Sequence, residues 1–202
     1  MDFAGFETIS GVAAGSAMTS VKIVVAGSFG VGKTTFVGSV SEIVPLTTEA
    51  AISPASRRLD DRTLAPDKVT TTVAMDFGRV TLEAGLVLYL FGAPGQHRFW
   101  FMWDDLIHGA IGAVVLVDTR RLLDSFPAVD YFESRRLPFL VAINGFHGEF
   151  PHEVADVREA LTISPQVPVI KCDARQRAST NQTLTALVEH ALAMKLNRQV
   201  AS

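Results

Sequence analysis

The chain has 202 residues, of which 48% are apolar and 19% charged, and its formal net charge is −3. This length suits one domain with its own hydrophobic core. The slight acidity argues against nucleic-acid binding, which usually requires a basic face. The single Cys172 cannot form an internal disulfide and points to a reducing compartment. No apolar run approaches the roughly 20 residues of a membrane span. Composition therefore favours a cytoplasmic α/β domain.

Residues 1–20 are rich in Gly, Ala, Ser and Thr without a steady period, which predicts a flexible N-terminal arm. From residue 21, β-branched runs alternate with helix-like stretches. The expected strands are 21–26, 73–82, 86–91, 111–117, 139–143 and 167–170. The expected helices are 34–40, 99–108, 126–135, 152–161 and 183–196. This alternation predicts an α/β domain over 21–199, with a mainly parallel six-stranded sheet, helices on both faces and a ligand at the carboxyl ends of the strands.

The segment 42–71 interrupts this alternation. It shows no sustained period and contains three prolines, so we expect a long loop that is either functional or disordered. After it, the turn at 83–85 separates two strand-like runs and predicts a hairpin, whose first strand is an antiparallel edge strand.

One motif in the chain has a specific chemical meaning. It fits GxxxxGK[ST] at every fixed position, after an expected strand and at the start of an expected helix. Its residues are Gly27, Ser28, Phe29, Gly30, Val31, Gly32, Lys33 and Thr34, followed by Thr35. Such a loop holds phosphates with its backbone N–H groups and the helix N-terminus. Lys33 is expected to reach the β- and γ-phosphates, and the Thr34 hydroxyl to bind Mg²⁺.

The order of this P-loop, the long loop, the hairpin and the sequence GAPGQHRF resembles the small Ras-like GTPases. The segments AMDFGR, FGAPGQHRF and AINGFHG are similar to those of the conservon GTPases of actinobacteria, which resemble the gliding-motility GTPases. The resemblance implies a P-loop NTPase G domain that binds GTP or GDP with Mg²⁺ and acts as a signalling switch. It also implies a roadblock-fold partner and a sensor-kinase-like partner, through which the protein is recruited to the membrane.

The resemblance assigns the metal site and catalysis to particular residues. Thr72 matches the switch threonine that closes on Mg²⁺, with Thr70 and Thr71 as alternatives. Gln96, after Gly95, matches the glutamine that orients the attacking water, so Gln96 and Lys33 are the candidate catalytic residues. The family's usual Mg²⁺-positioning Asp is replaced by Gly92. Either this chain binds the metal more weakly, or another acid, Asp118 or Asp76, replaces it.

The base-reading loop matches the family only in part. Where Ras-like proteins have NKxD, this chain has Asn144, Gly145, Phe146 and His147. A histidine cannot replace a bidentate carboxylate without loss, whereas Phe146 offers a stacking face. The segment Cys172-Asp173-Ala174-Arg175 resembles the family's Ser-Ala-Lys loop. There the Ala174 N–H is expected to meet the base oxygen, which favours guanine over adenine.

Five consecutive large apolar residues, 99–103, follow Gly95 and Gln96, which match the second switch of the family. On a helix they span about 400° at 100° per residue, more than a core-facing stripe covers. We therefore expect a partner-binding face that includes Phe99, Trp100 and Trp103, since Trp is common at interface hot spots. The alternative is burial under the long loop. The chain carries no prenylation cysteine, so no lipid anchor of the Ras type is expected.

Three functions remain open from the sequence. The first is a switch that hydrolyses GTP. The second is a nucleotide-dependent binding module with little or no hydrolysis, because the metal-positioning Asp is missing. The third is an ATP-using P-loop enzyme, which the incomplete NKxD motif allows.

Overall fold

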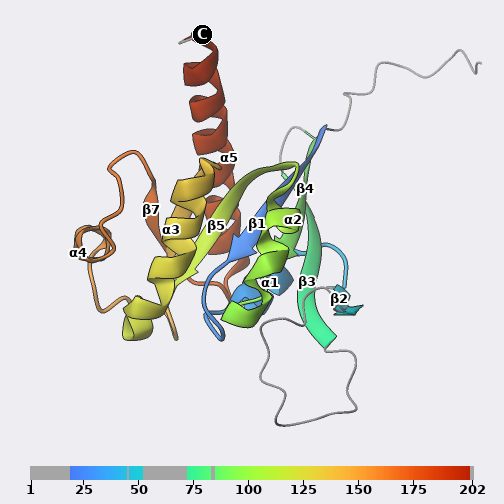
Figure 1. Ribbon diagram of the computed structural model, residues 1–202, viewed down its shortest axis with the longest axis horizontal. Helices are drawn as coiled ribbons and strands as arrows, with labels where there is room; N and C mark the ends of the chain where they lie inside the picture. Colours follow the sequence, from blue (N-terminus) through green and yellow to red (C-terminus); the bar gives the residue numbers. More distant parts are fainter. Residues whose placement is uncertain (1–18, 45, 52–71, 83–84, 201–202) are drawn as a thin grey trace, which may run out of the picture.

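The computed structural model describes residues 19–44, 46–51, 72–82 and 85–200. They form a seven-stranded sheet in the order β2-β3-β4-β1-β5-β6-β7, with helices packed around it (Figure 1). The strands are β1 (Thr19–Ala26), β2 (Leu46–Ala51), β3 (Thr72–Thr81), β4 (Leu86–Gly92), β5 (Ala110–Val117), β6 (Phe139–Asn144) and β7 (Val169–Cys172). The α-helices are α1 (Lys33–Val40), α2 (Trp103–Ile107), α3 (Phe126–Arg135), α4 (Val154–Ala160) and α5 (Arg177–Val200), and two 3₁₀ helices are η3 (His97–Met102) and η4 (Thr119–Ser125).

The predicted fold class is confirmed, with one additional strand. Strands β4, β1, β5, β6 and β7 pair in parallel, and β3 pairs antiparallel with β4 as expected. The additional strand β2 pairs antiparallel with β3, so β3 is not the edge strand. The sequence LTTEAA of β2 has few of the β-branched and aromatic residues that mark a strand. Its backbone pairing with β3 is a long-range contact that no local pattern reveals.

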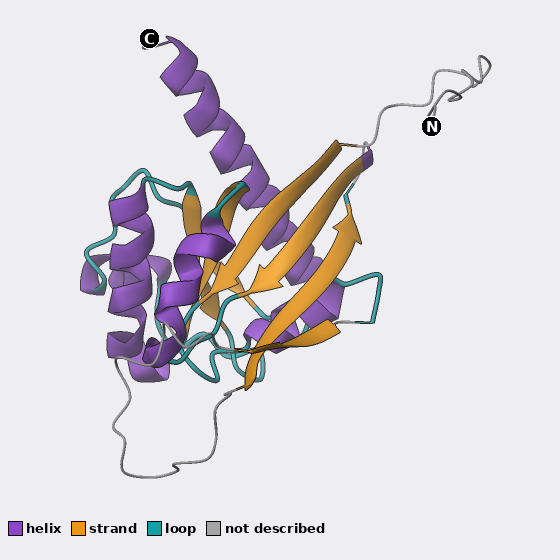
Figure 2. Cartoon of the chain, turned by 45° about the vertical axis from the view of Figure 1, so that its right-hand side comes forward, coloured by secondary structure: helices purple, strands orange, loops and turns teal. Residues whose placement is uncertain are grey.

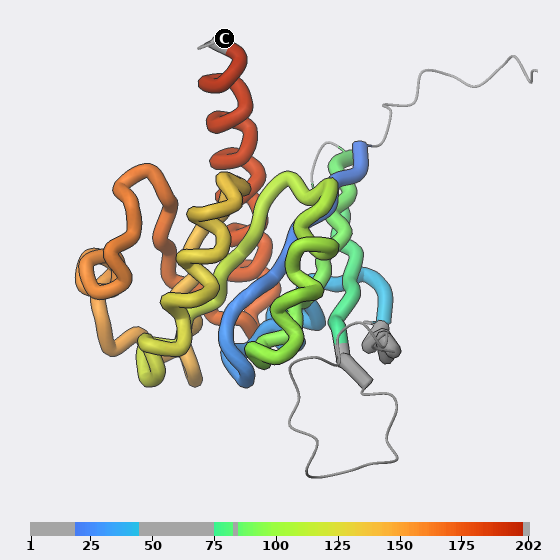
Figure 3. Tube along the Cα trace, in the orientation of Figure 1, coloured from blue at the N-terminus to red at the C-terminus, as the bar shows by residue number. Residues whose placement is uncertain are grey.

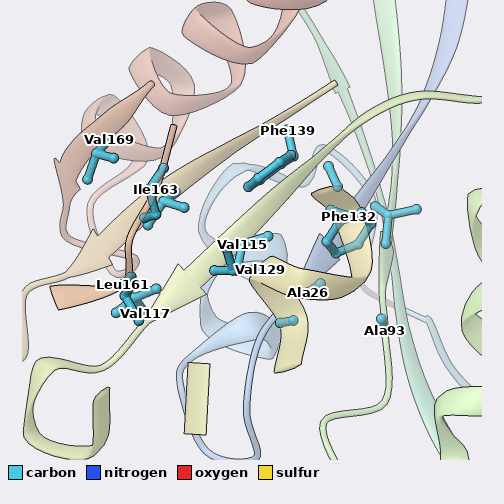
Figure 4. Packing of buried hydrophobic residues seen from close by; sticks show 14 of the residues in the cluster. Ala26, Ala93, Val115, Val117, Val129, Phe132, Phe139, Leu161, Ile163 and Val169 are labelled. Carbon is cyan, nitrogen blue, oxygen red and sulfur yellow. The ribbon is translucent and has the colours of Figure 1, made fainter. Parts of the chain in front are cut away.

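Two hydrophobic layers cover the sheet, because successive side chains of each strand point to opposite faces. In β5, Val115 and Val117 belong to one buried cluster, whereas Val114 and Leu116 belong to the other. The first cluster includes residues of α2, α3 and α4, among them Val129 and Phe132 (Figure 4). The second includes residues of α1 and α5. Strands β1, β5 and β6 are covered on both faces, which explains their nearly continuous apolar sequences.

The helices differ from expectation at two places. The expected helix 99–108 is a 3₁₀ helix, η3, followed by the five-residue α2. The last helix, α5, begins earlier and runs longer than expected, with 24 residues. Its C-terminal half extends past the sheet (Figures 1 and 2) and exposes Leu192 and Leu196. Among the described residues, no helix is both long and apolar enough to cross a membrane.

The parallel strands bring several loops to one edge of the sheet. The loops after β1, β5 and β6 lie together at the lower end of the molecule in Figure 3, opposite the C-terminal end of α5. They carry the P-loop, the Asp118 turn and the Asn144 loop. Ligands of open α/β sheets bind at this edge.

The candidate nucleotide site

The P-loop has a backbone that requires glycine. Gly27, Gly30 and Gly32 adopt positive φ angles of 135°, 75° and 105°, which side-chain-bearing residues rarely adopt. A Cβ atom at Gly27 would also lie 2.5 Å from the Leu116 carbonyl oxygen. Gly32 is the N-cap of α1. The loop therefore turns tightly between β1 and α1 and directs the helix N-terminus toward the carboxyl edge of the sheet, as the motif predicts.

Lys33 folds back over this loop. Its Nζ donates hydrogen bonds to the carbonyl oxygens of Ser28, at 2.8 Å, and Gly27, at 3.0 Å. Burial lowers the pKa of Lys33 to about 8, and the negative charge of Asp76 opposes this shift. The ammonium group is thus held at the phosphate cradle, where its positive charge is only weakly solvated.

The Asp76 side chain lies where the side chain of an aspartate at position 92 would lie. The two residues are paired across β3 and β4, and a Cβ atom at Gly92 would lie 3.0 Å from Asp76 Oδ2. The Thr34 hydroxyl donates a 2.7 Å hydrogen bond to this same oxygen. Of the two acids expected as replacements, Asp76 is therefore at the P-loop threonine, whereas Asp118 binds Arg120.

The oxygen atoms of Thr34 and Asp76 fit the preference of Mg²⁺ for hard ligands, with few protein ligands and several waters. Thr72, the expected switch threonine, is the first residue of β3. Its alternatives Thr70 and Thr71 lie outside the described residues. Over the part of the chain that the structure describes, no group of three or more His, Cys, Asp or Glu side chains is arranged to hold a metal ion.

The loop after β4, which the resemblance identifies as the second switch, lies against the P-loop. A Cβ atom at Gly95 would be 2.6 Å from Lys33 Nζ and 2.7 Å from the Phe29 nitrogen, so only glycine fits there. The next residue, Gln96, accepts a 2.9 Å hydrogen bond from Arg98 Nε through its side-chain oxygen. Gln96 thus follows the residue that contacts the P-loop, and its side-chain oxygen is engaged by its own loop.

Asn144, at the end of β6, connects the P-loop to the loop after β7; the P-loop and the loops after β6 and β7 form the rim of the phosphate cradle. Its Nδ2 donates to the Val31 carbonyl oxygen of the P-loop at 2.8 Å. Its Oδ1 accepts from the Ala174 N–H at 3.1 Å. The Ala174 N–H was expected to meet the base oxygen, but in the structure it already donates to Asn144. The Ala174 N–H therefore gives no separate argument for guanine. Cys172, buried at the end of β7, accepts a hydrogen bond at its carbonyl from the Gly145 N–H.

The other residues of the expected base site form two groups. Phe146 lies 3.6 Å beneath the Arg120 guanidinium, while His147 is exposed and adopts a positive φ of 59°. Asp173 is buried and paired with Arg175. Arg120, which contacts Phe146, was not among the residues expected here. Its sequence context is the pattern Asp-x-Arg, which follows directly after both β5 and β7.

The aromatic segment is only partly exposed, which corrects the expected partner-binding face. Phe99 is 6% and Trp103 1% exposed, and Trp103 Nε1 donates to the Pro94 carbonyl oxygen at 3.1 Å. Trp100 is half-buried and stacks between His97 and Trp103. Phe101 is the ring that points outward, at 49% exposure. The change from η3 to α2 turns Phe99 and Trp103 inward and leaves Phe101 outside.

Known proteins resemble this chain in fold and, over part of it, in sequence. This chain is 28% identical over 126 residues to an uncharacterised protein of Methanocaldococcus jannaschii. The matched region covers 61% of this chain and 69% of that protein. The G domain of the T. maritima FeoB iron transporter is 17% identical, with a TM-score of 0.60 over 85% of this chain and 99% of that one. The Arl6 (BBS3) small GTPase from Trypanosoma brucei, solved with the nucleotide analogue GppNp, is 17% identical with a TM-score of 0.61 over 87% and 99%.

These structural likenesses show the fold of GTPase G domains. Such a P-loop fold implies a bound nucleotide, with Mg²⁺ as its usual companion. A family model described as "Conserved hypothetical ATP binding protein" matches residues 25–194, which is most of the chain. The chain therefore belongs to this family of P-loop proteins, and its fold is that of a G domain.

Proposed function

We propose that the protein is a nucleotide-dependent switch that binds GTP with Mg²⁺, hydrolyses it slowly, and signals through the loops around the P-loop. The observation that carries this proposal is the 2.7 Å hydrogen bond between Thr34 and Asp76. It places a carboxylate beside the P-loop threonine, in a chain that has Gly92 at the position of the family's metal-positioning aspartate.

Each part of the cradle has a task in this reaction. The P-loop N–H groups and the start of α1 bind the phosphates. Lys33 gives up its contacts with Gly27 and Ser28 and places its charge on the β- and γ-phosphates. Thr34 and Asp76 would hold Mg²⁺, which supplies positive charge against the phosphate oxygens when bound. Gln96 orients the attacking water once it leaves Arg98.

Switching follows from the close approach of Gly95 to the P-loop. Because Gly95 lies directly against Lys33 and Phe29, a γ-phosphate in the cradle displaces it or captures its N–H. The residues that follow, up to the exposed Phe101, then move with it, while Trp103 stays anchored in the core. We propose that a protein partner reads this movement, and the sequence resemblance favours a roadblock-fold protein.

A second candidate function is a nucleotide-binding module with little hydrolysis. It is favoured by the hydrogen bond that holds the Gln96 oxygen on Arg98, which keeps the glutamine away from a water at the γ-phosphate. The family description adds ATP as a candidate nucleotide. The rate of hydrolysis distinguishes the two functions. The relative affinities for GTP and ATP distinguish the two nucleotides.

Single-turnover hydrolysis of radiolabelled GTP and ATP, with protein in excess and Mg²⁺ present, tests the proposal. We expect slow GTP hydrolysis that Gln96→Leu reduces at least tenfold, while Lys33→Ala abolishes binding. Gln182→Leu, an exposed change on α5, is the matched control and keeps the rate. GTP binding with an unchanged rate in Gln96→Leu would remove the glutamine from the chemistry, and faster turnover of ATP than GTP would reject guanine specificity.

A further inference from the structure

Two arginines at the carboxyl edge of the sheet are held in the same way. After β5, Asp118 Oδ1 accepts from the backbone N–H and the Nε of Arg120, and its Oδ2 accepts from Arg120 Nη2. After β7, Asp173 makes the same three contacts with Arg175. The distances lie between 2.8 and 3.0 Å in both cases. Each guanidinium is therefore fixed in a plane by a two-pronged ion pair.

The two carboxylates are buried, whereas the two arginines face solvent. The Asp118 and Asp173 side chains are 0% and 5% exposed, and those of Arg120 and Arg175 are 58% and 48% exposed. Hydrogen bonds from Arg175 lower the pKa of Asp173 to about 2, and those from Arg120 lower the pKa of Asp118. Both carboxylates stay charged at neutral pH and keep the guanidinium groups oriented.

Arg120 also has an aromatic support. Its guanidinium carbon lies 3.6 Å from the centre of the Phe146 ring, which is a close stacking distance. One face of the guanidinium is covered by this ring. The exposure of the side chain leaves the rest available for a second flat group. Arginine planes stack on nucleobases as well as on aromatic side chains.

Both arginines belong to the same rim as the phosphate cradle. Asn144 binds Val31 of the P-loop and Ala174, the residue before Arg175. Phe146, under Arg120, is two residues after Asn144. The neighbouring Arg121 donates from Nη2 to the Phe29 carbonyl oxygen of the P-loop at 2.9 Å, so the Arg120 turn also contacts the cradle. A nucleotide with its phosphates on the P-loop therefore has its base at this rim.

We propose that Arg120 is the stacking platform for the purine base and that Arg175 reads the base edge, with Asp118 and Asp173 as positioning residues. This inference rests on the proposed nucleotide-binding function and adds its base-recognition residues. A guanidinium has hydrogen-bond donors and no acceptor. Arg175 therefore favours a purine with a carbonyl at position 6, as in guanine, over one with an amino group, as in adenine.

Equilibrium titration of the full chain with GTP, GDP and ADP tests these roles. We expect Arg120→Ala to weaken all three nucleotides by a similar factor, roughly 5- to 100-fold, as for loss of one base stack. Arg120→Lys keeps the charge but lacks the plane, so it should not restore affinity. Arg175→Ala should weaken GTP and GDP but leave ADP unchanged. Arg135→Ala, at the end of α3, is the control and should leave all three affinities unchanged.

If Asp118 acts through Arg120, the double variant Asp118→Asn with Arg120→Ala reveals it. Asp118→Asn should weaken the three nucleotides by about the factor seen for Arg120→Ala, and the double variant should lose no more than either single one. Thermal melting confirms that each variant is folded. Unchanged affinities in folded Arg120→Ala, full rescue by Arg120→Lys, or additive losses in the double variant would overturn the inference. If instead the wild type binds no nucleotide, or Lys33→Ala binds as well as the wild type, the proposed function itself fails.

Discussion

Asp76 and Gly92 face each other on neighbouring strands, and only one of them has room for a side chain beside Thr34, where we propose that Mg²⁺ binds. An aspartate on either strand would place a carboxylate beside Thr34, but the two side chains do not fit together, because a Cβ at Gly92 already meets Asp76 at 3.0 Å. The chain thus carries its acid on β3 with a glycine opposite it on β4. The Thr34 hydrogen bond holds that acid at the P-loop.

A carboxylate moved to the other strand tests this arrangement. We expect Asp76→Gly to lower the Mg²⁺-dependent part of GTP affinity roughly 10- to 100-fold, the range for loss of a residue that orients a metal site. The double variant Asp76→Gly with Gly92→Asp should recover most of it, because the new side chain enters the vacated space. Titrations with Mg²⁺ and with EDTA measure both effects. Equal Mg²⁺ dependence in the wild type and in Asp76→Gly would contradict the assignment.

The lowered pKa of Lys33 predicts a pH dependence of nucleotide binding. Only the protonated ammonium attracts phosphate, and without nucleotide its pKa is about 8. GTP affinity should therefore be nearly constant below pH 7 and fall as the pH rises through 8, toward about tenfold per pH unit above it. Calorimetric titrations from pH 6.5 to 9.5 measure this slope. A profile that stays flat to pH 9.5 would show that the Lys33 charge does not limit binding.

At the scale of elements, the segment 97–107 combines a core role with an exposed one. Trp103 lies in the cluster beneath α2 and α3, where it packs on Phe132 and Tyr131. Phe101, two residues earlier, is half exposed. The break between η3 and α2 produces this alternation, so the segment anchors the loop after β4 to the core while it presents one ring outward.

Alanine substitutions separate these two roles. Trp103→Ala should lower the free energy of unfolding by about 3–5 kcal/mol, because it leaves a cavity in the core. Phe101→Ala should change it by less than about 0.5 kcal/mol, as a surface substitution does. Urea unfolding followed by circular dichroism measures both. Similar destabilisation by the two variants would mean that Phe101 is buried in solution as well.

The elements differ in how far the sequence predicts them, for a physical reason. The P-loop with β1 and α1 was predicted closely, because glycine spacing and a β-branched run are local signals. Strand β2 was missed because its register with β3 arises only on folding. The choice of Asp76 over Asp118 also needed the structure, since Thr34 and Asp76 are 42 residues apart and meet across the fold. The core role of Trp103 was hidden because its helix is too short for a helical period.

For the whole molecule, one sheet edge collects the parts of the site. Parallel strands β1, β5, β6 and β7 end there, so the phosphate cradle, the Asp118 and Asp173 turns and Asn144 become neighbours although they are distant in sequence. The antiparallel β3 begins at the same edge, and its residue Asp76 lies at the start of α1. A small, mildly acidic domain thereby concentrates four basic residues, Lys33, Arg120, Arg121 and Arg175, around one phosphate-binding loop.

We propose that this edge of the sheet binds a nucleoside triphosphate through the P-loop. Isothermal titration of the purified chain with a non-hydrolysable GTP analogue in excess Mg²⁺ measures that binding. We predict one site per chain and a loss of at least about 100-fold in affinity for Lys33→Ala, since the charge–phosphate contact is removed. Absence of binding to the wild type, or equal affinity of the folded Lys33→Ala variant, would show that the P-loop does not hold the nucleotide.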